Sequence, residues 1–293
     1  MSRLPLTVVG GYLGSGKTTL INRLLAVDHG LRLAVLVNDF GAINIDAALL
    51  KSAREDTIEL TNGCVCCSMA GNLYYAIGDM LDRSPRPDHL IVEASGIADP
   101  AKIAELALSE PEMAYAGILT VIDGINYPVQ LANPRISSQL RGQASAADLL
   151  VVSKTPPDDP AVTAALGDCG SDPRVGADDA ATVAGLVLGR TLTREAPAES
   201  RAKHPGYVQW SSTSPPELTR TEIEALLSRL PSGVLRLKAL IADPSGGMWE
   251  VHVVGEQREI TQRVKSGCAA VAAIGLEGAE MVDAIEDWWN STV

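Results

Sequence analysis

The chain of 293 residues is poor in positive charge, in aromatic side chains and in long apolar stretches. Lysine and arginine total 24 against 36 acidic side chains. The resulting net charge of −12 argues against an overall positive potential that would bind nucleic acid. No apolar run approaches the roughly 18 residues that a membrane span needs. The N-terminus lacks the apolar stretch of a secretory signal. We therefore expect a cytoplasmic protein without a membrane or nucleic-acid partner.

Cysteine is also scarce, and the five cysteines do not suggest a disulfide framework, because an odd number in a chain without a secretory signal argues against pairing. Hydrophobic residues, in contrast, make up 46% of the chain, which is too many for a disordered protein. At roughly 150 residues per domain, the length predicts one large or two ordinary domains with a real core.

The first two thirds of the chain alternate apolar runs with helical patterns. Apolar runs without polar alternation are typical of strands buried on both faces, and helices between such strands imply a parallel sheet. The sequence therefore predicts an α/β fold with helices on both faces of the sheet. The expected strands are residues 4–10, 31–37, 89–93, 117–122 and 149–152, and the expected helices lie near 16–25, 69–82, 99–108, 136–146 and 179–188.

The last third of the chain has a different pattern of apolar and polar residues. Residues 193–206 are polar and contain two prolines and a glycine, as expected of a linker. Beyond them the pattern predicts a small α+β domain with a helix, a β-hairpin, an apolar stretch and a final helix, at 217–230, 234–255, 268–274 and 277–289. We therefore expect a nucleotide-binding domain over 1–192, a linker over 193–206 and a C-terminal domain over 207–293.

Residues 11–18, GYLGSGKT, match the phosphate-loop pattern G-x-x-x-x-G-K-[ST] between an expected strand and an expected helix. Glycines let successive N–H groups turn toward phosphate oxygens, and the helix N-terminus adds its dipole. Lys17 is expected to reach the β- and γ-phosphates, and Thr18 to bind Mg²⁺. The sequence therefore predicts a P-loop nucleoside triphosphate site. The residues expected around the phosphates are Gly11, Gly14, Ser15, Gly16, Lys17, Thr18 and Thr19.

Two further segments follow expected strands, where the rest of such a site belongs. Glu93 ends the apolar strand at 89–93 and suits a carboxylate facing Mg²⁺, and Gly96 can sense the γ-phosphate. Residues 38–41, NDFG, follow the strand at 31–37, where a nucleotide-sensing loop would begin. The alternative for either segment is an ordinary turn at a strand end.

Three cysteines fall within four residues, at Cys64, Cys66 and Cys67. Thiolates are soft ligands that select Zn²⁺, Cu⁺ or similar ions, and three of them leave one tetrahedral position open. An incomplete shell suits a site that must release its metal. The alternatives are a redox pair or inert buried thiols. Cys169 and Cys268 stand alone and are expected to be structural.

Together, GYLGSGKTT, NDFG, GCVCC, IVEASGIADP and the C-terminal VLRLKA resemble the CobW-type metallochaperone GTPases, of the same P-loop class as the nickel-insertion GTPases of hydrogenase and urease. The resemblance covers nearly the whole chain. It implies GTP hydrolysis coupled to delivery of a metal, often zinc or cobalt, to a client protein.

Residue by residue, the resemblance assigns phosphates and Mg²⁺ to Lys17 and Thr18, the magnesium-facing carboxylate to Glu93, γ-phosphate sensing to Gly96, and the transition metal to the cysteine triplet. Asp39 stands where the family usually has glutamate. This shorter side chain is a candidate ligand for either metal.

The base-recognition segment departs from the family pattern Asn-Lys-x-Asp, because the sequence here is Ser153-Lys154-Thr155-Pro156. Lys154 can stack along the base, and Ser153 can replace part of the bracing that asparagine provides. Pro156 offers no carboxylate to guanine N1 and N2, and such a loss shifts specificity strongly. Asp158 or Asp159 is a candidate substitute, and relaxed use of GTP and ATP is the alternative.

The interpretation is a GTP-hydrolysing metallochaperone that uses GTP, Mg²⁺ and Zn²⁺ or Co²⁺. Its client metalloprotein is expected to dock through the C-terminal domain, and the sequence leaves a homodimer open. Two alternatives come from other classes: an ATP-using P-loop phosphotransferase with a structural zinc, and a non-hydrolysing sensor of metal or redox state.

Overall fold

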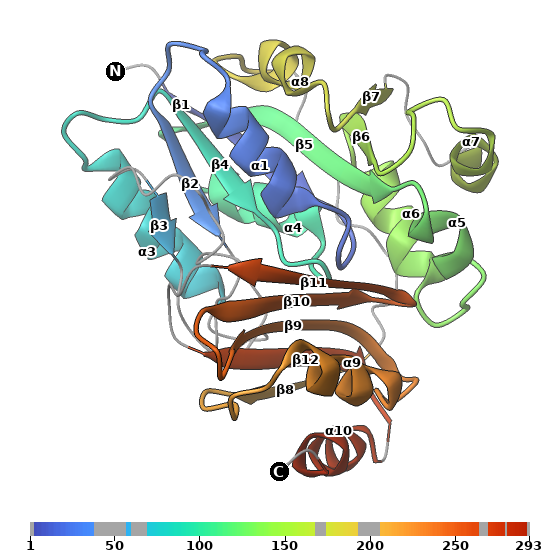
Figure 1. Ribbon diagram of the computed structural model, residues 1–293. Coiled ribbons are helices and arrows are strands. Elements are labelled where there is room, and N and C mark those ends of the chain that lie inside the picture. Colours follow the sequence, from blue (N-terminus) through green and yellow to red (C-terminus); the bar gives the residue numbers. More distant parts are fainter. Residues whose placement is uncertain are drawn as a thin grey trace. The chain divides into compact units, whose positions relative to one another are not determined.

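The structure is a computed structural model that describes residues 3–37, 57–59, 69–167, 174–192, 206–263, 269–278 and 280–291. The described residues fall into two compact units, one within residues 3–192 and the other within 206–291. Figure 1 shows their elements with the labels used from here on.

The first unit is built on a seven-stranded sheet in which all neighbours are parallel, in the order β3-β2-β4-β1-β5-β6-β7. The central strands are buried along nearly their whole length, as expected of strands covered on both faces. The strands are β1 (Leu4–Gly10), β2 (Leu33–Val37), β3 (Thr57–Glu59), β4 (His89–Glu93), β5 (Met113–Asp123), β6 (Leu149–Ser153) and β7 (Arg174–Gly176).

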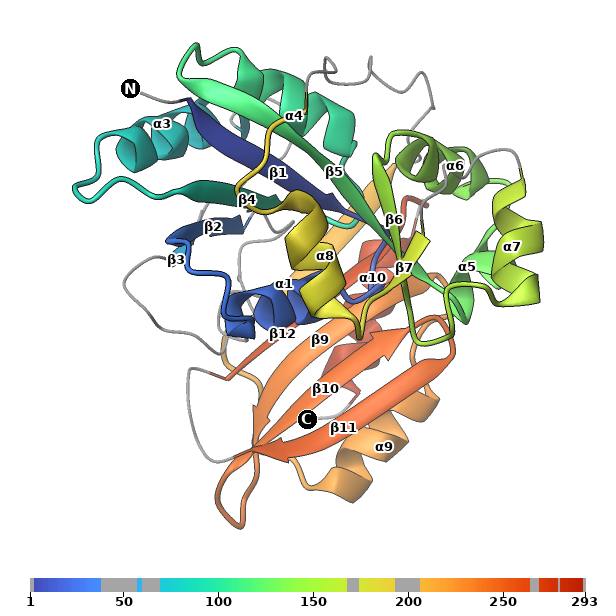
Figure 2. The same ribbon diagram turned by 90° about the horizontal axis from the view of Figure 1, so that it is seen from above.

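Helices cover both faces of this sheet and bury a separate hydrophobic core on each (Figure 2). On one face α3 and α4 pack against β1, β2, β4 and β5, and on the other face α1 and α8 pack against the same sheet. The α/β fold with two covered faces is therefore confirmed. The helices are α1 (Lys17–Ala26), α3 (Met69–Leu81), α4 (Pro100–Leu108), α5 (Asn126–Gln130), α6 (Ser137–Ser145), α7 (Pro160–Leu166) and α8 (Ala180–Val187).

One strand of this sheet begins earlier than the sequence pattern predicts. The expected start at Gly117 was wrong, because β5 already begins at Met113. Gly117 has a φ of 116°, and the pairing register with β1 shifts between Leu6 and Thr7, so the chain passes through a bulge there. A glycine within a strand can mark such a bulge rather than an end of the strand.

The second unit is a five-stranded antiparallel sheet in the order β11-β10-β9-β12-β8. Helices α9 and α10 and the alternate residues of the sheet form one core, in which Trp288 Nε1 donates to Leu226 O at 2.9 Å. The small α+β fold is therefore confirmed. Its elements are β8 (Tyr207–Ser212), α9 (Arg220–Ser228), β9 (Val234–Ala242), β10 (Met248–Val254), β11 (Gln257–Arg263), β12 (Ala270–Leu276) and α10 (Met281–Asn290).

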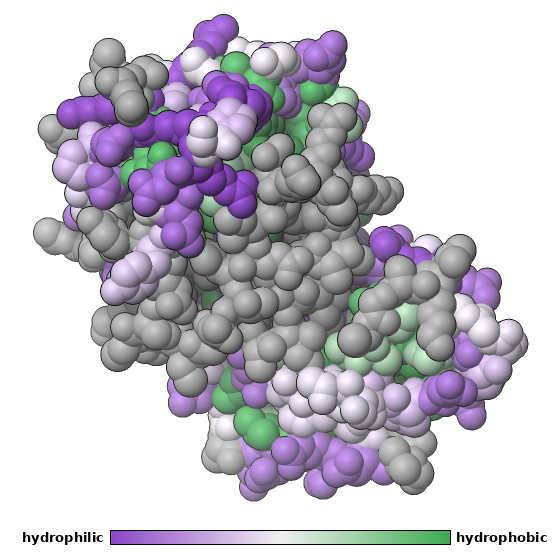
Figure 3. All heavy atoms as spheres, turned by 90° about the vertical axis from the view of Figure 1, so that its left-hand side faces the viewer, coloured by the Kyte–Doolittle hydropathy of each residue, from purple (hydrophilic) through white to green (hydrophobic). Residues whose placement is uncertain are grey.

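The coloured atoms on the face in Figure 3 are mostly hydrophilic, with hydrophobic atoms in small separate groups. The large hydrophobic side chains with substantial exposure include Tyr75 on α3 and Val129 on α5, which come from different elements. None of the helices in the described ranges combines the length and the apolar character that crossing a membrane would need.

Candidate nucleotide site

The predicted phosphate loop connects β1 to α1 at the edge of the sheet where the parallel strands end. Gly11, Gly14 and Gly16 have φ values of 131°, 72° and 98°, in the left-handed region that glycine adopts without strain. A methyl group added to Gly11 would overlap Val121 O in the neighbouring strand. Backbone conformation and close packing therefore both call for glycine at Gly11.

Lys17, the first residue of α1, folds its side chain back over this loop. Its Nζ donates to Gly11 O at 3.0 Å and to Tyr12 O at 3.2 Å, and the side chain is buried. A buried ammonium needs such hydrogen bonds to offset its desolvation. The charge of Lys17 is therefore held against the loop that the sequence assigns to the phosphates.

Thr18 and Glu93 come together although 75 residues separate them in the sequence. Glu93 pairs in register with Val9 of β1, which places the end of β4 next to the start of the loop. Thr18 Oγ1 donates to Glu93 Oε1 at 2.9 Å, and Glu93 is buried. A hydroxyl and a carboxylate at this distance are two hard oxygen ligands of the kind that Mg²⁺ binds.

Gly96 lies directly against the phosphate loop. A methyl group at Gly96 would lie 2.8 Å from Leu13 N and 2.9 Å from Leu13 Cα, which is closer than backbone atoms tolerate. The segment after β4 therefore approaches the loop so tightly that only glycine fits. Thr19, by contrast, is exposed on α1.

Two glutamines of α6 hold the segment that contains Gly96, and the sequence did not point to them. Gln143 Nε2 donates to Gly96 O at 3.2 Å and to Ala98 O at 2.9 Å, and Gln139 Nε2 donates to Ile97 O at 2.7 Å. Both glutamines are buried. Three consecutive carbonyls after β4 are thereby fixed by one helix. The only signal in the sequence was two glutamines four residues apart in an expected helix, on one face of it.

Ser153 and Lys154 follow β6 and contact the phosphate loop and the neighbouring strand. Ser153 Oγ donates to Ser15 O at 2.7 Å, and Lys154, with a φ of 67°, places Nζ 2.6 Å from Asp123 Oδ2. Asp123 is buried, and its Oδ1 also accepts the N–H groups of Ile125 and Asn126. Asp123 therefore orients Lys154, a role that the sequence does not reveal although this residue ends an apolar strand.

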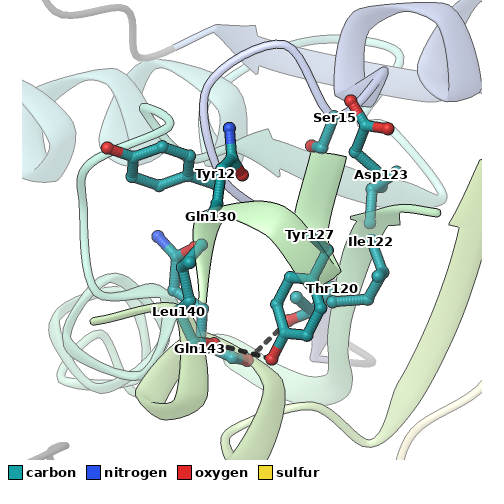
Figure 4. Close-up of a pocket in the computed structure, with 10 residues that line it drawn as sticks. Tyr12, Ser15, Thr120, Ile122, Asp123, Tyr127, Gln130, Leu140 and Gln143 are labelled. Atoms are coloured by element: carbon teal, nitrogen blue, oxygen red, sulfur yellow. Dashed lines mark hydrogen bonds between the residues drawn. The ribbon is translucent and has the colours of Figure 1, made fainter. Parts of the chain in front are cut away.

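A small pocket lies between the phosphate loop, β5, α5 and α6 (Figure 4). It has space for about one water molecule. Tyr12 and Ser15 line it from the loop, and Thr120 and Asp123 line it from β5. The pocket is too small for a nucleotide.

The remaining predicted ligands, Asp39, Cys64, Cys66 and Cys67, lie outside the described residues. Within the described part of the chain, no three histidine, cysteine, aspartate or glutamate side chains gather into a group that could hold a metal ion.

A parallel sheet, a glycine loop between β1 and α1, and a lysine and a threonine at the start of that helix define a P-loop nucleotide-binding protein. The nucleotide-binding domain of the CobW/HypB/UreG family matches residues 5–166, and the chain belongs to this family.

Known relatives are similar over parts of the chain. The zinc chaperone CobW of a Sinorhizobium species is 39% identical over 131 residues, which are 41% of this chain and 37% of that protein. The zinc chaperone YjiA of Escherichia coli K12 is 31% identical over 163 residues, 53% of this chain and 50% of that protein. The matches thus cover less than two thirds of either relative.

Among solved structures, HypB from Helicobacter pylori in complex with nickel matches with a TM-score of 0.45 and 18% sequence identity. The match covers 62% of this chain and 83% of that chain.

Proposed function

We propose that the protein is a GTP-hydrolysing metallochaperone that binds zinc or cobalt through Cys64, Cys66 and Cys67 and passes it to a client metalloprotein. The observation that carries the nucleotide part is the contact of Thr18 with Glu93 at the phosphate loop, 2.9 Å apart, beside the buried Lys17. The similarity to proteins named zinc chaperones supports the metal part.

In this proposal the triphosphate lies along the phosphate loop. The Lys17 ammonium exchanges the carbonyls of Gly11 and Tyr12 for phosphate oxygens, which are stronger acceptors. Thr18 and Glu93 hold Mg²⁺, and their oxygens fit this ion because it prefers hard ligands. When bound, Mg²⁺ neutralises charge on the phosphates.

The transition metal is cargo in this proposal and not a resident cofactor. Three thiolates bind Zn²⁺ or Co²⁺ tightly but leave the shell incomplete, which permits transfer to a client. Nucleotide and metal are coupled if the cysteine segment takes different arrangements with GTP and GDP. The client, expected at the C-terminal unit, then receives the metal after hydrolysis.

The direct test combines GTP turnover with zinc affinity on the full chain. We expect Mg²⁺-dependent GTP hydrolysis that Lys17→Ala abolishes and that Lys102→Ala, an exposed substitution on α4, leaves unchanged. Zinc affinity measured by competition with a chelator is expected to differ between a non-hydrolysable GTP analogue and GDP. Cys66→Ser is expected to weaken zinc binding, whereas Cys169→Ser is not.

Equal zinc affinity with both nucleotides would overturn the coupling. A preference for ATP, together with zinc that stays bound in every nucleotide state, would instead favour a phosphotransferase with a structural zinc. That alternative is supported by Pro156, which stands where a base-recognising carboxylate is expected.

A further inference from the structure

Recognition of guanine requires an acceptor that the segment after β6 does not supply at its usual place. Guanine differs from adenine in presenting N–H donors at N1 and N2, and a carboxylate accepts both. Pro156 has no such group. A carboxylate from elsewhere at the same edge of the sheet is therefore needed if this chain selects GTP, and in this sense the inference rests on the proposed function.

Among the described residues, four aspartates lie in the two neighbouring segments after β6 and β7, and two of these four already accept hydrogen bonds at helix N-termini. Asp159 Oδ1 accepts the N–H groups of Ala161 and Val162 at the start of α7. Asp179 Oδ1 accepts the N–H group of Thr182 at the start of α8. If one of these capping carboxylates bound the guanine base instead, the backbone N–H groups at its helix N-terminus would lose their acceptor.

Asp158 and Asp178 remain, and both are exposed. The side chain of Asp178 folds back over Gly176, the last residue of β7. A methyl group added to Gly176 would lie 2.6 Å from Asp178 Oδ1 and 3.8 Å from Pro157 Cδ, so the carboxylate and the ring of Pro157 approach the same point. Asp178 thus stands beside the residue that follows Pro156.

The backbone around Asp178 is fixed relative to the phosphate loop. Ala177 N donates to Val152 O of β6 at 2.8 Å, and Asp179 N donates to Gly176 O at 3.1 Å, which forms a turn. Arg23, on the helix that follows the phosphate loop, donates to Ala177 O at 2.7 Å. The segment after β7 is therefore attached both to the strand that carries Ser153 and to the helix that carries Lys17.

From these contacts we infer that Asp178 is the specificity-determining carboxylate for guanine in this chain and replaces the aspartate that Pro156 displaces. Lys154, held by Asp123, stacks its stem along the base, and Asp178 accepts the N1 and N2 protons from the segment after β7. The acceptor for the guanine N–H groups thus follows β7 instead of β6, whereas the phosphate loop keeps its usual pattern.

The test is whether the Asp178→Asn substitution, made in the full chain, changes the preferred nucleotide from GTP to XTP. The amide keeps an acceptor for N1–H and adds a donor, which meets the carbonyl that xanthine carries in place of the N2 amino group. We expect the wild-type chain to bind GTP at least tenfold more tightly than XTP, and the variant to bind XTP more tightly than GTP, with fluorescent triphosphates as probes.

Asp158→Asn is the matched control, because it makes the same charge change in the adjacent segment. An unchanged GTP-to-XTP ratio in Asp178→Asn, or a reversal in Asp158→Asn instead, overturns the assignment. Equal wild-type binding of GTP, ATP and XTP also overturns it but leaves the phosphate site intact. No triphosphate binding at all overturns the proposed function itself.

Discussion

At the scale of single residues, His89 shows how a histidine is kept neutral in the core. It is fully buried at the start of β4, where Nε2 lies 2.9 Å from Thr7 Oγ1 and Nδ1 accepts the Gly189 N–H at 3.1 Å. With Nδ1 as an acceptor, the proton of the neutral ring lies on Nε2. Burial, with a smaller effect from the charge of His29, lowers the pKa of His89 to about 4.

This histidine predicts a loss of stability in mild acid. Between pH 6.5 and 4 the unfolded chain binds a proton at His89 that the folded chain does not, so the free energy of unfolding falls as the pH drops through this window. The full effect is about 3 kcal/mol. Urea unfolding across this range is expected to show a steeper pH dependence for the wild type than for His89→Asn. Parallel curves would contradict the prediction.

Gly96 gives a second prediction at this scale. Gly96→Ala forces the added methyl group against the backbone of Leu13, so the phosphate loop or the segment after β4 must move. We expect at least tenfold weaker binding of a non-hydrolysable GTP analogue, measured by titration calorimetry. Gly78→Ala is the control, because a methyl group there meets nothing within 4 Å and lies in α3, where alanine is the better helix former.

Unchanged affinity in Gly96→Ala would show that the contact with Leu13 does not position the site. A loss in Gly78→Ala equal to that in Gly96→Ala would point to a general effect on folding.

At the scale of elements, α6 serves the nucleotide site without contributing a predicted ligand. Gln143→Leu removes the donor to Gly96 O, which is buried, and to Ala98 O, which is half-buried. The free energy of unfolding is expected to fall by about 1–3 kcal/mol. Because Gly96 faces the phosphate loop, we also expect a change in the ratio of GTP-analogue to GDP affinity.

Gln139→Leu provides the comparison, since it removes only the bond to Ile97 O. A merely structural role for Gln143 would weaken both nucleotides equally in the two variants. A changed affinity ratio confined to Gln143→Leu would support a role of Gln143 in positioning the segment that is proposed to sense the γ-phosphate.

The sequence predicted the central strands of the sheets better than the edge strands. The central strands β1, β2, β4 and β6 are buried on both faces, so their apolar runs stand out. The edge strands were missed. Strands β3 and β7 have three residues each, and β11, with the sequence QREITQR, is half-exposed and polar. An edge strand depends on pairing with a neighbour, which leaves little pattern in its own sequence.

At the scale of the whole molecule, the proposed coupling makes a reciprocal prediction. If a GTP analogue changes zinc affinity by some factor relative to GDP, then zinc must change the relative affinity of the two nucleotides by the same factor. We expect the two ratios, from zinc competition and from nucleotide titration, to agree within error and to collapse together to one in Cys66→Ser. Ratios that differ would show that the measured states are not at equilibrium.

The sequence by itself determined the features that depend on local order: the alternation of strands and helices, the glycine loop with Lys17 and Thr18, and Glu93 and Gly96 at a strand end. Each of these leaves a pattern within a few residues because backbone conformation and periodicity are local.

Only the tertiary structure decided which distant groups meet. It brought Thr18 to Glu93, Asp123 to Lys154, and Gln143 to the carbonyls after β4. It also placed Asp178 beside Pro157 across two strand ends. Such pairings depend on strand order and register, and no single segment of the sequence specifies either. The side chains that meet at the carboxyl ends of parallel strands come from segments that are separated along the chain by the connecting helices.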